Sequence, residues 1–420
     1  MSQLFGKTLR QPPAEAETPS HQLLLRAGLV HQIAAGVYAF LPLAWRALQH
    51  IERIIREEMD AEGGQELMMP AIHPIEVWQA SGRDQVMKDI LFRFSDKRDR
   101  EFVLGPTHEE IIVELFKRHV LSYRDLPLLV YQIQQKFRDE PRPRGGLIRL
   151  RQFTMKDLYS FDTDFDGLDV SYRKMYDAYT RIFQRCGVPT IPVLADSGAM
   201  GGRDTHEFIY LTEYGEDTCL LCPKCGYAAN AEVAAFVKEP AHPPEADEEP
   251  QPVQEIPTPG LYTIQALADH LNIPTSKTCK AVFYSASYSD HEEPVFVAIR
   301  GDMDVNEPKL RRALGAVDLH YMSEAEVAAA GFVPGSAGAV GLKGVRIVAD
   351  DLLTQETNLV AGANKPDTHL LNVNYGRDWQ ADTVADIARA GEGSLCAVSA
   401  DKQAAPASGG ALCRTAMDAR

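Results

Sequence analysis

A short stretch of the chain, from Lys136 to Asp157, combines residue types that can bind a nucleotide. Arginine side chains bind phosphate oxygens through paired hydrogen bonds, and an aromatic ring such as that of Phe153 offers a surface for a base. Seven basic residues stand here against three acids, although the whole chain has a formal net charge of −16. The basic residues are Lys136, Arg138, Arg142, Arg144, Arg149, Arg151 and Lys156. A solvated surface hairpin is the simpler interpretation of any single Arg-x-Glu, but this concentration predicts an anion-binding site.

Two strands joined by a loop are expected to position these side chains. Apolar residues alternate with polar ones around Phe137 and again from Leu147 to Phe153, and prolines and glycines interrupt the pattern between them. Because alternate residues of a strand share one face, Arg138 and Glu140 should lie together on the first strand. The residues expected to share a face of the second strand are Arg149, Arg151 and Phe153.

Helical periodicity appears on both sides of this hairpin. It runs from Gly28 to Glu62 and again from Ser171 to Cys186, where aromatic residues line one face. Between them, Thr107 is suited to cap a helix, with Glu109 and Glu110 in its first turn. The apolar face of the first helix would consist of Ala44, Leu48, Ile51, Ile55 and Met59.

Length and composition indicate an ordinary globular protein. The chain has 420 residues, 45% hydrophobic and 24% charged, enough for two or three domains with their own cores. The N-terminus lacks an apolar signal core, and the uncharged stretch Ala27–Trp45 contains glycines and a proline that suit no membrane span. Seven cysteines in such a chain do not indicate a disulfide framework. We therefore expect a cytoplasmic protein that does not enter a membrane.

Three cysteines with overlapping C-x-x-C spacing raise the question of zinc. Cys222 and Cys225, preceded by Cys219, could hold one side of a tetrahedral ion, but a structural zinc site needs four ligands. Cys396 and Cys413 could supply the rest, although they do not form a second C-x-x-C pair. A reduced knuckle without metal is the favoured interpretation.

The composition divides the chain into four parts. An acidic, proline-rich segment without Lys or Arg occupies residues 239–255 and predicts a surface linker over 236–256. A first domain would cover residues 1–235, and a second, with its own helix and strand patterns, residues 257–393. The last residues, 394–420, are rich in Ala and Ser without apolar periodicity, which is typical of a disordered tail.

The pattern Phe137-Arg138-x-Glu140, a Pro/Gly loop and then Arg149-x-x-x-Phe153 resembles motif 2 of the class II aminoacyl-tRNA synthetases. With its flanking residues the chain is similar to the bacterial type of prolyl-tRNA synthetase, over residues 1 to about 395. The helix and strand before Pro70 resemble motif 1, which in that family forms a homodimer interface. The resemblance implies an α+β fold: an antiparallel sheet with flanking helices, plus an inserted mixed α/β editing domain.

The activity implied by this resemblance joins proline to tRNA(Pro) with ATP and Mg²⁺, by way of prolyl-adenylate. The catalytic residues would be Arg138, on the α-phosphate, and Glu140, on the adenine side. Arg149 would reach the outer phosphates, and Phe153 would stack on adenine. Proline would be bound by Thr107, Glu109 and His206.

The inserted domain implies a second activity, the hydrolysis of Ala-tRNA(Pro) made in error. A pocket for proline cannot exclude the smaller alanine, because a missing methylene is worth only about 1–3 kcal/mol. The positions that match the editing site of the family are Lys280, Gly331, Pro334, Asp350 and His369.

The resemblance ends after Gly393. The family continues with motif 3, whose arginine binds the γ-phosphate, and with an anticodon-binding domain, and we expect both to be absent here. A different class of function therefore stays open: a chain that only hydrolyses Ala-tRNA in trans or binds tRNA, or an inactive fragment.

Overall fold

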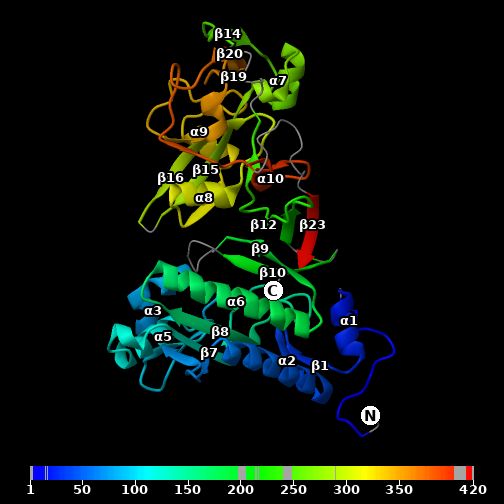
Figure 1. Cartoon of the computed structure of the whole chain (residues 1–420). Coiled ribbons are helices and arrows are strands. Elements are labelled where there is room, and N and C mark those ends of the chain that lie inside the picture. Colours follow the sequence, from blue (N-terminus) through cyan, green and yellow to red (C-terminus); the bar gives the residue numbers. More distant parts are fainter. Residues whose placement is uncertain are drawn as a thin grey trace.

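The computed structural model describes residues 3–14, 16, 18–196, 205–212, 215, 217–239, 248–288, 290–401 and 413–418. Figure 1 shows an elongated molecule with two bodies and a small barrel between them. One body holds the N-terminal helices and the long hairpin, and the other holds the insertion. Within the part of the chain that the structure describes, none of the helices has the length and apolar character needed to cross a membrane.

The first body is built on a three-stranded sheet in the order β3-β7-β8. Its strands are β3 (Gln65–Glu66), β7 (Leu128–Phe137) and β8 (Gln152–Phe161), and β7 and β8 are antiparallel over their whole length. Helices α2 (Pro42–Ala61) and α6 (Phe165–Arg185) pack on this sheet around Met59, Tyr131 and Ile182. Arg181 of α6 also binds Glu58 of α2 at 2.6 Å. The hairpin that carries the basic stretch therefore rests on a well-packed layer of helices.

Smaller elements complete the first body. Strands β4 (Ile72–Pro74), β6 (Glu101–Leu104) and β5 (Arg93–Ser95) form a second antiparallel sheet. The helices beside it are α3 (Ile75–Ser81), α4 (Arg83–Val86), α5 (Glu109–His119) and the short 3₁₀ helix η1 (Tyr123–Asp125). Before α2 lie α1 (Pro19–Arg26), β1 (Val30–Ala34) and β2 (Val37–Phe40).

The prediction of helical structure from Gly28 onward is wrong for its first part. Residues 30–40 form the antiparallel β1–β2 hairpin, and the helix α2 begins only at Pro42. Gly36 adopts a φ of +74°, which favours a turn at this point, and proline suits the first turn of a helix because its missing N–H has no partner there.

The basic hairpin also differs from its prediction. The second strand starts at Gln152 rather than near Leu147, and it continues to Phe161. Gly145 and Gly146 both have positive φ values, +67° and +68°, so the chain turns repeatedly before the strand begins. Arg149 therefore lies in a 14-residue loop over 138–151, and the predicted sharing of strand faces is wrong for Arg138, Glu140 and Arg149.

A small closed barrel follows the first body, with strands in the order β10-β23-β11-β12-β9. Its strands are β9 (Thr190–Leu194), β10 (His206–Leu211), β11 (Asp217–Leu221), β12 (Ala228–Asn230) and β23 (Cys413–Asp418). The glycine-rich turn before His206 lies outside the described residues.

The prediction of a disordered tail from residue 394 onward is contradicted by the described parts of that tail. Strand β22 (Leu395–Cys396) pairs with β13 (Phe236–Val237), and α10 (Ala397–Asp401) follows. Strand β23 pairs along β11 and meets the end of β10, so partners almost 200 residues earlier satisfy its backbone groups. Residues 402–412 and 419–420 lie outside the described residues.

The insertion contains a five-stranded mixed sheet and a three-stranded antiparallel sheet. The larger sheet consists of β17 (Asp318–Tyr321), β15 (Cys279–Ser287), β16 (Glu292–Arg300), β18 (Arg346–Asp350) and β21 (Thr383–Ala385). The smaller consists of β14 (Gln254–Pro257), β20 (Thr368–Val373) and β19 (Leu359–Gly362). The remaining elements are α7 (Ile264–Leu271), α8 (Glu307–Leu314), α9 (Glu324–Ala329), η3 (Thr275–Lys277) and η4 (Asp351–Gln355).

Part of the predicted linker belongs to these folded units. Its first residues form β13 and its last residues form β14, whereas residues 240–247 lie outside the described residues. The insertion therefore begins at or before Gln254, because β14 pairs with β20 along its whole length.

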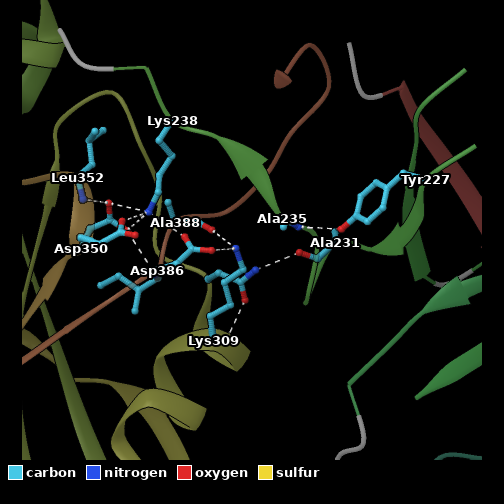
Figure 2. A network of polar contacts seen from close by, with 12 residues as sticks. Tyr227, Ala231, Ala235, Lys238, Lys309, Asp350, Leu352, Asp386 and Ala388 are labelled. Atoms are coloured by element: carbon cyan, nitrogen blue, oxygen red, sulfur yellow. Dashed lines mark hydrogen bonds and ion pairs between the residues drawn. The ribbon is translucent and has the colours of Figure 1, made fainter. Parts of the chain in front are cut away.

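Lys238 directly follows β13, in the segment that leads into the insertion. It contacts the insertion through the polar network in Figure 2. Its ammonium lies 2.9 Å and 3.0 Å from the two carboxylate oxygens of Asp350 and 2.8 Å from Asp386, and it also binds Asp351. The Asp350 side chain is fully buried, and that of Lys238 is 9% exposed. One lysine thus compensates the charge of a buried aspartate.

Replacing Lys238 by methionine should strongly destabilise the insertion. A buried aspartate that loses its ionic partner costs about 3–5 kcal/mol, and the free energy of unfolding of Lys238→Met should fall by about this amount. Urea denaturation followed by circular dichroism measures the change.

The matched control is Lys365→Met, which removes the exposed ion pair with Glu255 in the same body. An exposed pair contributes at most about 1 kcal/mol, so this variant should remain close to the parent protein. Equal losses in the two variants would show that burial does not govern the Lys238 network.

Candidate functional site

The basic loop holds a cluster of the predicted nucleotide-binding residues. The guanidinium of Arg138 lies over the ring of Phe153, 5.3 Å from its centroid, and Arg149 lies 3.8 Å from the carboxylate of Glu140. The structure therefore brings together all four residues predicted to bind ATP. A guanidinium can bind phosphate oxygens, and an aromatic ring offers a surface on which a base can stack.

Backbone hydrogen bonds hold this loop in place. The N–H of Arg138 donates to the carbonyl oxygen of Arg151 at 3.0 Å, which extends the hairpin beyond its last regular pair. The N–H of Arg151 donates to the carbonyl oxygen of Gly36 at 2.9 Å, so the β1–β2 turn also holds the loop in place. These contacts fix the backbone of a loop that has few apolar anchors of its own.

The segment before α5 lies next to the end of β7. The N–H of Phe137 donates to the carbonyl oxygen of Gly105 at 3.2 Å. The hydroxyl of Thr107 donates to Glu109 at 2.5 Å, and Arg83 lies 3.3 Å from the same carboxylate. Thr107 and Glu109 thus form a pair, as expected of a shared binding role. The predicted cap is wrong, because His108 precedes the helix and no side chain caps it.

Beneath these residues lies a buried network that the sequence interpretation missed. Lys136, with no exposed surface, places its ammonium 2.9 Å from Asp157 and 2.5 Å from Nδ1 of His108. Asp157 also accepts hydrogen bonds from Gln132 at 2.9 Å and Tyr159 at 2.6 Å. The available signal was a polar stripe on one face of β7 formed by Gln132, Gln134 and Lys136, at a spacing of two residues.

This network joins the two groups of predicted residues. Lys136 pairs with Phe153 across the hairpin and contacts the histidine beside Thr107. Burial lowers the pKa of Lys136, while the carboxylates of Asp157 and Glu109 oppose that shift. Burial and the charge of Glu109 raise the pKa of Tyr159. The nucleotide-binding and proline-binding candidates therefore share one electrostatic environment.

His206, the third residue predicted to bind proline, lies on β10 against α6. Its Nδ1 is 2.8 Å from the hydroxyl of Tyr172, and its ring meets Tyr176 edge-on at 5.4 Å. The described contacts of His206 are thus with α6, and they do not include Thr107 or Glu109.

Two histidines below the site are held in the neutral form. Nε2 of His73 and Nε2 of His108 both lie 3.0 Å from the carbonyl oxygen of Pro70, so each ring must donate there. The other nitrogen of each ring accepts, from Trp78 at 3.3 Å in His73 and from Lys136 in His108. Burial and the neighbouring positive charges lower the pKa of each histidine to about 4.

The five predicted editing residues lie on both sides of the insertion sheet. Lys280 pairs with Ile299, and Asp350 follows Ala349, which pairs with Ala298. Alternation therefore places Lys280 and Asp350 on the same face as Ile299, the face that packs on α8. Lys280 binds Asp304 there at 2.8 Å, and Asp350 binds Lys238.

The loop with Gly331 and Pro334 covers the opposite face, where Phe332 packs on Phe296. His369 lies on β20, and its Nδ1 is 2.6 Å from the buried hydroxyl of Thr258. The described contacts do not join these residues to Lys280 or Asp350. The described contacts of Asp350 include those of both carboxylate oxygens with Lys238.

Cys222 and Cys225 lie at the base of the insertion, where Cys396 joins them. Cys219 lies in a separate apolar cluster and donates to the carbonyl oxygen of Ala229 at 3.3 Å. Cys413 stands opposite Leu221 on β23.

Comparisons with known proteins show the family to which the chain belongs. A family model described as the tRNA synthetase class II core domain (G, H, P, S and T) matches residues 92–384. A proline–tRNA ligase from Dehalococcoides mccartyi (strain 195) is 53% identical over 395 residues, which cover 94% of this chain and 68% of that protein. One from Pelotomaculum thermopropionicum is 54% identical over 398 residues, which cover 94% of this chain and 69% of the relative.

Among solved structures, a prolyl-tRNA synthetase from Cryptosporidium parvum complexed with L-proline and AMP is similar with a TM-score of 0.43 and 17% identity. The match covers 49% of this chain and 42% of that one.

The chain therefore has the core of a class II aminoacyl-tRNA synthetase, with the expected α+β fold of antiparallel sheets and flanking helices. Within that class it belongs to the family of the proline–tRNA ligases, over about two thirds of their length. The predicted family and enzyme class are confirmed.

Because His73 and His108 are neutral in the folded protein, the stability of the protein should depend on pH. In the unfolded chain a histidine has a pKa of about 6.5, so between about pH 6.5 and pH 4 the unfolded state binds more protons than the folded state. The free energy of unfolding should therefore fall as the pH decreases through this window, by on the order of 2 kcal/mol for each histidine. Urea denaturation at a series of pH values measures it.

His73→Gln is the matched variant, because an amide can donate to Pro70 and accept from Trp78 without titrating. Its stability should depend less steeply on pH by the contribution of one histidine, and the carboxylates common to both proteins cancel in the difference. Parallel curves for the two proteins would contradict the neutral assignment of His73.

Proposed function

We propose that this chain carries the site at which a proline–tRNA ligase activates proline with ATP and passes it to tRNA(Pro). The carboxylate of proline attacks the α-phosphorus of ATP, and pyrophosphate leaves with the electrons of the broken bond. A terminal ribose hydroxyl of the tRNA then attacks the carbonyl carbon, and AMP leaves. The observation that carries this proposal is the Arg138–Phe153 pair, linked through Lys136 to Thr107 and Glu109.

The nucleotide side of the site is assigned to the basic loop. Arg138 binds the α-phosphate and stabilises the charge that develops there, which is the main contribution a protein makes to phosphoryl-type transfer. Phe153 stacks on adenine, and Glu140 accepts hydrogen bonds on the adenine side. Arg149 reaches the outer phosphates. Mg²⁺ would arrive with the nucleotide and would neutralise part of the phosphate charge beside Arg149.

The proline side is assigned to Thr107 and Glu109. The carboxylate of Glu109 pairs with the positively charged imino nitrogen of proline. Thr107 orients that carboxylate through its hydrogen bond. Tyr159 stays protonated next to Glu109, so the pocket keeps a single negative charge for the substrate. His206 closes the pocket from β10, held there by Tyr172.

A homodimer through motif 1 is part of this proposal, as is a cytoplasmic location beside the tRNA pool. Large apolar side chains are exposed around the N-terminal hairpin and α2, among them Ile33, which is 67% exposed, and Trp45, which is 47% exposed. Exposed apolar side chains of this size favour a protein partner, and a second copy of the same face would bury them.

The activation proposal is tested by Arg138→Ala. This variant should lose proline-dependent exchange of pyrophosphate into ATP by at least about a hundredfold, because the charge on the α-phosphate loses its partner. Binding of a non-hydrolysable prolyl-sulfamoyl adenosine should weaken in parallel, and calorimetry measures this without turnover.

Arg142→Ala, an exposed arginine of the same loop, serves as the control and should keep both properties. Exchange or analogue binding by Arg138→Ala within tenfold of the parent would overturn the assignment of Arg138.

We further propose that the insertion hydrolyses Ala-tRNA(Pro). The support is a body with its own sheets and core, and a loop seated tightly against β19. A Cβ on Gly338 would lie 2.0 Å from the carbonyl oxygen of Gly362, so only glycine permits this approach. The loop with Gly331 and Pro334, together with His369, would receive the alanyl ester. Lys280, which pairs with the exposed Asp304, would contact a tRNA phosphate from the other face.

These roles predict different kinetic effects in the hydrolysis of purified Ala-tRNA(Pro). His369→Ala should lower kcat by about tenfold or more, because it acts at the ester. Lys280→Ala should raise KM and keep kcat, since a phosphate contact contributes equally to ground state and transition state. Arg138→Ala should hydrolyse at the parental rate. No hydrolysis by the parent chain, or hydrolysis unaffected by His369→Ala, would contradict the editing proposal and leave the activation proposal untouched.

A further inference from the structure

Three cysteine thiols from distant parts of the sequence meet at the base of the insertion. Cys222 and Cys225 belong to the turn after β11, and Cys396 lies on β22, 171 residues further along the chain than Cys225. The three sulfur atoms lie within 4.8 Å of one another. Of the three residues, Cys222 and Cys396 are buried and Cys225 is half-buried.

The spacing of the sulfur atoms suits a tetrahedral metal ion. Two thiolates bound to zinc at about 2.3 Å with tetrahedral angles lie about 3.8 Å apart. Sγ of Cys225 lies 3.7 Å from Sγ of Cys396, which is far longer than the bond of about 2.0 Å in a disulfide. The pair therefore has the separation of two ligands on one ion without being covalently joined.

The turn between Cys222 and Cys225 is shaped to hold thiolate sulfur. The N–H of Cys222 donates to Tyr227 at 2.8 Å, and Gly226 takes a φ of +76° that closes the turn. The backbone N–H groups of Lys224 and Cys225 hydrogen-bond to Sγ of Cys222. Backbone N–H groups that converge on a sulfur atom stabilise its negative charge, as a ligand to a cation requires.

We propose that Cys222, Cys225 and Cys396 bind one zinc ion as thiolates, with a water molecule in the fourth position on the half-buried side of Cys225. Thiolates in tetrahedral arrangement select zinc over the harder cations. The cysteines belong to an apolar cluster with Leu220, Ala234 and Phe236, and the hydroxyl of Ser399 lies 3.8 Å from Sγ of Cys222. This site is independent of the ligase reaction proposed above.

The position of the ion gives it a structural role. Cys396 pairs with Phe236 where β22 returns beside the outgoing β13, so the ion would join the chain before the insertion to the chain after it. Bound zinc would therefore hold the base of the insertion closed, and its removal should expose the β13–β22 pair.

The test uses the full chain, purified under strong reductant and dialysed against a chelator. Inductively coupled plasma mass spectrometry after zinc addition and gel filtration should give one zinc per chain. Cobalt in place of zinc should produce thiolate-to-metal charge-transfer absorption together with the visible bands of tetrahedral cobalt. Zinc should also protect three thiols from Ellman's reagent and slow trypsin cleavage after Lys238, which follows β13.

Variants define the ligands. Cys225→Ser and Cys396→Ser should lose at least about tenfold in zinc affinity, whereas Cys219→Ala, which removes a buried cysteine outside the cluster, should keep one zinc per chain. If a serine variant fails to fold, the thiol protection measured in the parent protein still shows whether zinc binds the three cysteines.

Zinc well below one per parent chain, three thiols equally reactive with and without zinc, or a Cys225–Cys396 disulfide in the reduced preparation would each overturn the proposal.

Discussion

The candidate site depends on a lysine ammonium placed where water does not reach. Lys136 has no exposed surface, and a buried charge is tolerated only when an opposite charge and hydrogen-bond acceptors surround it. Asp157 supplies the charge from β8, and His108 supplies an acceptor from the segment before α5. Because each partner belongs to a different segment, satisfying one ammonium brings the end of the hairpin and the Thr107–Glu109 pair into a fixed relation. The neutral state of His108 is part of the same constraint, since a protonated ring could not accept from Lys136.

A second buried charge has the same effect at the other end of the molecule. Asp350 is held by Lys238 and by two backbone N–H groups, those of Leu352 and Ile387. Lys238 follows β13. If β13 separated from the insertion, Asp350 would lose its ionic partner or its buried charge would become exposed to solvent (Figure 2). Asp350 was predicted to serve editing, and its described contacts are with Lys238 and with these backbone groups.

The sequence predicted the parts of the fold that depend on local pattern. The basic hairpin, the aromatic face of α6 and the separate insertion all follow from periodicity and composition, and the pattern Arg138-x-Glu140 with Arg149 and Phe153 does cluster. It failed where two periods fit the same residues, as in residues 30–40, and it did not identify the buried network around Lys136. It also failed for β23, because strand pairing with β11 is non-local and a short segment rich in small residues carries little signal of it.

The two proposed activities place a mechanical demand on the segments between them. A pocket that admits proline must also admit alanine, so an aminoacyl end has to reach the insertion before it leaves the enzyme. The strands β13 and β22, on either side of the insertion in the sequence, pair with each other over two residues. Two paired residues cannot by themselves hold a body of this size in one orientation. Lys238 directly follows β13, and Cys396 of the thiol cluster formed with Cys222 and Cys225 lies on β22. The charge pair and the proposed metal site therefore act on the same property, the orientation of the insertion relative to the site that loads the tRNA.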